Sequence, residues 1–108
     1  MKLEEFKRLC SKRLNHCTSI MYGVKNDEYT RNGDKLHNFK RAASMLSSSP
    51  EEALLGMWSK HLTSILDIVK DLESDKLPSK EIVNEKFSDT INYLLLLEAL
   101  ITERMKGE

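Results

Sequence analysis

The chain has 108 residues, 40% of them apolar and 31% charged, which is typical of one globular domain and not of a disordered segment. Its 17 basic and 17 acidic residues cancel, so no basic excess favours a nucleic-acid partner. The longest apolar run, residues 94–97, is far too short to span a membrane, and the N-terminus lacks the apolar core of a signal peptide. We therefore expect a single cytoplasmic domain, residues 1–108, with neither nucleic acid nor a membrane as partner.

The first predicted element is an amphipathic helix over residues 3–21. Apolar residues recur there every three or four positions, at Leu3, Phe6, Cys10, Leu14, Cys17, Ile20 and Met21. Cys10 and Cys17 are two helical turns apart, roughly 10 Å by helical rise, which is too far for a disulfide. We interpret both as buried free thiols.

Residues 23–33 are rich in glycine, asparagine and aspartate, which predicts a polar loop. Loops on a rigid scaffold often carry functional residues, although a plain solvated connection is the alternative. A second helix is expected over residues 34–46, with Asp34 as its N-cap. Its polar side carries Asp34, His37, Asn38 and Arg41.

The third predicted helix, residues 50–72, has the clearest start in the chain. Ser49 is its N-cap, Pro50 takes the first helical position, and Glu52 completes a capping box. Its apolar surface is broad, which predicts a central helix or one shared with a partner subunit. Lys60 lies midway along it, where it can neutralise a phosphate, pair with an acid or simply be solvated. His61 is interpreted as a hydrogen-bonded core histidine.

The fourth predicted helix covers residues 80–104 and carries a polar stripe. At about 100° per residue, Glu85, Asp89 and Asn92 share one narrow face. Residues 94–97 are all leucine and cover every direction around the axis, which predicts burial on all sides. The polar stripe then runs into buried surface, so we interpret it as the wall of a pocket or the edge of a helical interface. An ordinary solvent-facing stripe is the alternative.

These elements predict an all-α, bundle-like fold of about four helices, with a modest core completed by oligomerisation. Carboxylates held close together repel one another, and a divalent cation relieves that repulsion. Carboxylate and amide oxygens suit Mg²⁺ or Mn²⁺, and Mg²⁺ commonly accompanies a phosphate substrate.

Five segments in order resemble a known family: 25–29 (KNDEY), 34–39 (DKLHNF), 50–57 (PEEALLGM), 60–61 (KH) and 85–94 (EKFSDTINYL). They are similar to small phage and prophage proteins, associated with nucleotide modification, of the MazG-like, all-α nucleoside triphosphate pyrophosphohydrolase superfamily. The resemblance implies a homodimer or homotetramer that uses Mg²⁺ to release pyrophosphate and a nucleoside monophosphate.

The resemblance also implies roles for particular residues. Glu85 and Asp89 match the acidic pair that holds the metal, and Glu28 or Asp34 would complete the metal shell or position the attacking water. Lys60 and Arg41 would meet phosphate, and the amides Asn38 and Asn92 would contact the nucleotide.

The sequence also departs from the family pattern. The superfamily's first motif, Glu-Glu-x-x-Glu, has no counterpart at a matching place, and Lys86 occupies the glutamate position of the later Glu-x-x-Asp motif. With fewer acidic residues than the superfamily pattern, the site would hold fewer cations. Two alternatives to hydrolysis therefore stay open: nucleotide binding at the same pocket, and a non-catalytic helical interaction protein.

Overall fold

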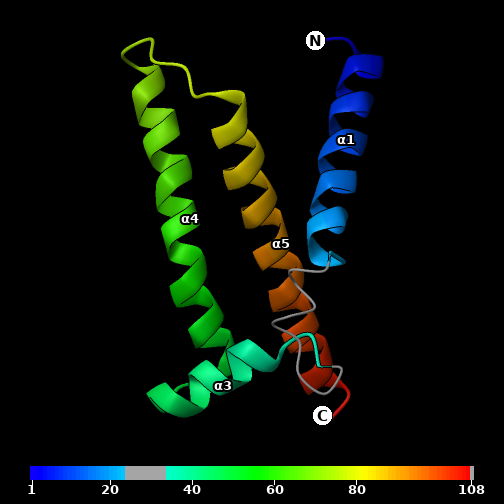
Figure 1. Ribbon diagram of the computed structural model, residues 1–108, viewed down its shortest axis with the longest axis vertical. Coiled ribbons are helices and arrows are strands. Elements are labelled where there is room, and N and C mark those ends of the chain that lie inside the picture. The colour runs from blue at the N-terminus through cyan, green and yellow to red at the C-terminus, as the bar shows by residue number, and fades with distance from the viewer. Residues whose placement is uncertain (24–33, 108) are drawn as a thin grey trace.

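The computed structural model describes residues 1–23 and 34–107. Within these ranges the fold is all-α, with four helices and no strand: α1 (Leu3–Met21), α3 (His37–Leu46), α4 (Pro50–Leu72) and α5 (Lys80–Met105). The antiparallel pair α4 and α5 forms the centre, α3 crosses one end of α4, and α1 packs against α5 (Figure 1). Among the described helices, none has the length and apolar character needed to cross a membrane.

The start of α4 confirms the local prediction. The backbone N–H of Glu52 donates to the Ser49 hydroxyl at 3.1 Å, and the Glu52 carboxylate accepts from the Ser49 backbone N–H. Ser47, at φ 53°, ends α3 in the left-handed region, so the two helices are joined by a tight serine turn. At the start of α5, the Ser79 hydroxyl accepts from the backbone N–H of Ile82.

The expected helix over residues 34–46 begins three residues late, at His37. The Asp34 carboxylate accepts from the backbone N–H of Leu36 at 2.9 Å, which stabilises the turn before the helix, and so Asp34 is not its N-cap. Lys40 donates to Asp34 at 2.7 Å and forms an ion pair with Glu103 at 3.0 Å. The first contact ties the turn before α3 to the helix, and the second ties α3 to α5.

The main apolar core lies where α3, α4 and α5 meet. Leu36, Phe39, Leu54 and Leu100 are buried there, and Leu54 is 0% exposed. On the other side of α5, Cys17 of α1 is also buried, whereas Cys10 is only half-buried; both are free thiols. The prediction of two buried thiols is therefore right for Cys17 alone.

The prediction that all four leucines at 94–97 are buried is wrong for the single chain. Leu94 is 54% exposed and Leu95 is 43% exposed. The reason is that, among the described helices, α5 packs against α4 and α1, and none of them covers its remaining side. The same holds for α4, where Leu62, Leu66 and Val69 are exposed.

Candidate functional site

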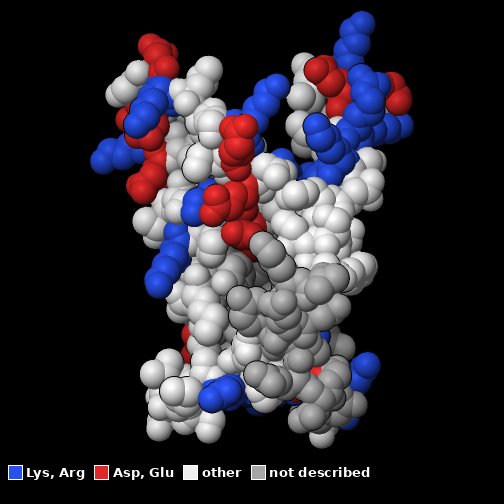
Figure 2. Space-filling view, viewed as in Figure 1, with Lys and Arg blue, Asp and Glu red and all other residues white. Residues whose placement is uncertain are grey.

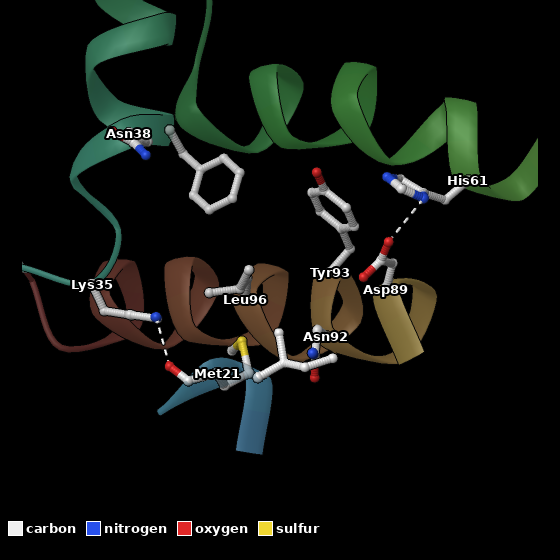
Figure 3. A pocket seen from close by; sticks show the side chains of 10 residues that line it. Met21, Lys35, Asn38, His61, Asp89, Asn92, Tyr93 and Leu96 are labelled. Atoms are coloured by element: carbon white, nitrogen blue, oxygen red, sulfur yellow. Dashed lines mark hydrogen bonds and ion pairs between the residues drawn. The ribbon is translucent and has the colours of Figure 1, made fainter. Parts of the chain in front are cut away.

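A cavity of about 230 Å³ lies where the C-terminal end of α1 meets α3, α4 and α5, and we call it the junction cavity. Polar and apolar side chains from all four helices and from the turn before α3 line it. They are Ile20, Met21, Lys35, Asn38, Phe39, His61, Asp89, Asn92, Tyr93 and Leu96. Figure 3 shows Lys35 and Asp89 at opposite ends, with Tyr93 and Leu96 between them.

One end of the junction cavity holds a carboxylate and two rings. Asp89 Oδ2 lies 3.5 Å from His61 Nδ1, an ion-pair distance if the imidazole is protonated. His61 Nδ1 has no hydrogen-bond partner among the described residues, so the prediction of a hydrogen-bonded core histidine is not met at this atom. The His61 ring lies 5.1 Å from the Tyr93 ring. Burial, together with the negative charge of Asp89, raises the pKa of the Tyr93 hydroxyl, which keeps it protonated.

The opposite end of the junction cavity is cationic. Lys35 Nζ donates to the backbone carbonyl of Met21 at 2.8 Å, which holds the ammonium group against the end of α1. An ammonium group has three donors, so two remain for a ligand. Asn38, in the first turn of α3, lines the same end (Figure 3). This end can therefore receive an anionic group.

Asn92 forms part of the cavity wall and is 6% exposed. Its Nδ2 donates to the backbone carbonyl of Cys17 at 3.2 Å, which links α5 to α1. Within the described part of the chain its Oδ1 has no hydrogen-bond partner. A buried acceptor without a partner is costly, so Oδ1 is suited to a donor from a bound molecule.

The structure separates the residues that the sequence placed together. Asp89, Asn92 and Asn38 line the junction cavity, whereas Glu85 does not; its side chain is 57% exposed and pairs with Lys86 at 3.5 Å.

The remaining candidate residues that the structure describes do not line the cavity. Asp34 forms hydrogen bonds with Lys40 and with the backbone N–H of Leu36 in the turn before α3. Lys60 and Arg41 are exposed and line no part of the cavity. Glu28 lies outside the described residues.

The donor set limits which metal centre can form. Among residues 1–23 and 34–107, no three His, Cys, Asp or Glu side chains come together in a way that could hold a metal ion. Asp89 is the one carboxylate among the described lining residues. Mg²⁺ is often held through one or two carboxylates plus substrate phosphates. The described lining therefore offers one carboxylate to a cation, and the described residues do not fit a centre of two cations.

Sequence reasoning missed three polar lining residues as members of the site: Lys35, His61 and Tyr93. Lys35 belongs to no periodic pattern, because it lies in the turn before α3. His61 and Tyr93 were within segments of interest, but they come from different helices, and only the packing of α4 against α5 brings them together. No spacing along the chain could have paired them.

The comparisons identify no relative. The chain matches no model of a protein family, no curated protein and no solved structure.

Proposed function

We propose that the chain binds a nucleotide in the junction cavity. The observation that supports this most is the lining, in which a lysine and a carboxylate stand at opposite ends with aromatic rings between them. A phosphate would lie toward Lys35 and Asn38, and a base would lie near Tyr93 and Phe39. Asp89 and the Oδ1 atom of Asn92 would then accept from N–H groups of the base. The choice of a nucleotide among polar ligands comes from the family resemblance.

A more demanding version of this proposal is that the chain also hydrolyses the bound nucleotide. Hydrolysis of a nucleoside triphosphate, in which a water adds to the α-phosphorus and pyrophosphate leaves, would need the reverse orientation, with the phosphates and one Mg²⁺ or Mn²⁺ at Asp89. The cation would supply Lewis-acid stabilisation of charge when bound. Tyr93 and His61, packed beside Asp89, would limit the access of bulk water to the carboxylate. With one carboxylate in the described lining, binding is better supported than turnover.

Thermal unfolding with a panel of nucleoside mono-, di- and triphosphates, with and without Mg²⁺ or Mn²⁺, tests the proposal. We expect at least one nucleotide to raise Tm, because a ligand that binds only the native state stabilises it. Asp89→Asn should remove the shift, and Glu85→Gln, one turn earlier on the exposed side of α5, should keep it. Lys35→Ala and Lys60→Ala form a second matched pair with the same expected contrast.

Phosphorus NMR of the same mixtures separates the two forms of the proposal. Pyrophosphate that appears only with a divalent cation, and not with Asp89→Asn, supports hydrolysis. A ligand recovered intact supports binding alone. If no nucleotide shifts Tm, or if Glu85→Gln removes the shift and Asp89→Asn keeps it, the proposal is wrong.

Self-assembly is a second candidate function, favoured by the exposed apolar residues of α5. Phe87, Leu94 and Ile101 recur every seven residues and are 39%, 54% and 45% exposed; we call them the α5 apolar face. Seven-residue spacing is the pattern by which helices pair along a seam. A second copy of the chain is the proposed occupant, because the chain carries no net charge and its own core is small.

Sedimentation velocity tests self-assembly. We expect the wild-type chain to sediment as a dimer or larger, and Leu94→Glu to sediment as a monomer. Thr102→Glu, an exposed position of the same helix outside this face, should leave the assembly unchanged. A wild-type chain that stays monomeric at every concentration would rule out this candidate.

A further inference from the structure

A second hollow, of about 770 Å³, lies between α1 and the start of α5. We call it the basic cleft. Its volume falls within the range common for small-molecule sites, and it shares no lining residue with the junction cavity. It is lined by Leu9, Lys12, Arg13, His16, Pro78, Lys80, Glu81, Val83 and Asn84. On the face drawn in Figure 2, basic atoms gather over the N-terminal half of α1, with acidic atoms among them.

Arg13 is the central residue of the basic cleft. Its Nη1 donates to the Asn84 backbone carbonyl at 3.1 Å, to Asn84 Oδ1 at 2.6 Å and to the Ser88 hydroxyl at 2.7 Å. All three acceptors are neutral, and among the described residues no carboxylate pairs with Arg13. A guanidinium group has five N–H donors in a planar fork, so Nε and Nη2 still have donors to offer. The result is a positioned, partly buried cation that no carboxylate of the described residues pairs with.

The neighbouring contacts hold Arg13 in this geometry. Because Asn84 Oδ1 accepts from Arg13, its Nδ2 is the atom that faces His16 Nε2, at 3.0 Å. An amide nitrogen can only donate, so Nε2 of His16 is the acceptor of this hydrogen bond. Asn84 is thus fixed from both sides, and it fixes the guanidinium in turn.

The rim of the basic cleft adds further charge. Lys12 and Lys80 are exposed side chains of the lining, and Glu81 is the one carboxylate among the described lining residues. Lys80 also begins α5, and the first backbone N–H groups of a helix have no partner within the helix and favour an anion. Three permanent cations therefore oppose one carboxylate.

Leu9, Pro78 and Val83 give the basic cleft an apolar side. We propose that the cleft binds a small phosphate monoester with an apolar body. The phosphate would pair with the free donors of Arg13 and with Lys12 and Lys80, and the apolar body would lie against Leu9 and Val83. Neither the junction cavity nor the α5 apolar face takes part.

NMR titration with phenyl phosphate and with inorganic phosphate tests this inference. We expect saturable shifts at the Arg13 Nε–H and at the backbone amides of Lys80 and Glu81, and tighter binding of phenyl phosphate than of inorganic phosphate. The double variant Lys12→Ala/Lys80→Ala should weaken binding of phenyl phosphate at least about 10-fold, because it removes two of three cations. Lys70→Ala, which removes a charge from α4 outside the cleft, should change affinity little.

Further variants keep the test independent of folding and of the junction cavity. Arg13→Lys keeps the charge but loses the fork, so we expect weaker binding, with far-UV circular dichroism as a check on helix content. Asp89→Asn should leave binding in the basic cleft unchanged. Shifts that do not saturate, that persist in the double variant, or that appear only at Asn38 and Tyr93 would overturn the inference; the last would instead support the junction cavity.

Discussion

The two ends of the molecule bury their apolar residues to different extents. At the closed end, where α3 crosses α4 and α5, Phe39 is 7% exposed and Leu54 is completely buried. At the open end, the N-terminal half of α1 stands apart from α4, and Phe6 and Leu9 are 52% and 51% exposed (Figure 1). The helices at the two ends have the same amphipathic pattern, with apolar residues every three or four positions. Periodicity therefore indicates which face of a helix is apolar, but not whether another helix covers it.

The largest expected effect compares one phenylalanine from each end. Phe39→Ala should lower the free energy of unfolding by about 3–5 kcal/mol, because it removes a large buried ring and leaves a cavity. Phe6→Ala should change it by less than about 1 kcal/mol, since half of that ring is already in water. Urea unfolding of both variants measures the difference. Equal losses would mean that the open end is covered in solution.

The second comparison concerns arginines of α1. Arg13→Met should cost about 1.5–3 kcal/mol, because Arg13 makes charge-assisted hydrogen bonds to Asn84 and Ser88 across to α5. Arg8→Met, at an exposed position nearer the N-terminus, should cost less than about 0.5 kcal/mol. Urea unfolding again gives the values, and a loss at Arg8 as large as that at Arg13 would show that α1 docks along its whole length.

A third change weakens the closed end locally. Ser49→Ala removes the N-cap of α4 and should cost about 1 kcal/mol, because the N–H of Glu52 loses its acceptor. Ser44→Ala, at an exposed position within α3, is the control and should be close to neutral. A neutral Ser49→Ala would mean that the serine turn is not needed to start α4.

The smallest expected effect depends on pH. The hydrogen bond from Lys40 lowers the pKa of Asp34 below its ordinary value of 3.8. A lowered carboxylate pKa adds stability above the ordinary pKa, and that stability is lost as the pH falls through the lowered value. Asp34→Asn should therefore cost up to about 1 kcal/mol at neutral pH, and this cost should shrink as the pH falls below about 3.8 and vanish once the pH is below the lowered pKa. A cost that persisted in acid would assign the effect to packing.

Local signals were readable from the sequence, and non-local ones were not. The capping box at Ser49 and Glu52 needs only four consecutive residues, and both it and the bounds of α4 are confirmed. Asp89 and Glu85 differ by one helical turn on the same stripe, so a helical wheel cannot say which of them faces the cavity. Which of the two carboxylates faces the cavity depends on the packing of α4 against α5, which brings His61 close to Asp89. Leu94 and Leu95 show the same limit, because their exposure depends on which elements pack against α5.

The attachment of α1 has a consequence for the order of folding. Among the described helices α1 packs against α5 alone, and its hydrogen bonds to Asn84 and Asn92 join residues 71 and 75 positions apart in the chain. Closing so long a loop is entropically costly, whereas α3, α4 and α5 are joined by short connections. We therefore expect α1 to dock last and to open first, with its amides exchanging with deuterium before those of α4. Because Ile20 and Met21 of α1 complete the junction cavity, a ligand bound there should slow that exchange.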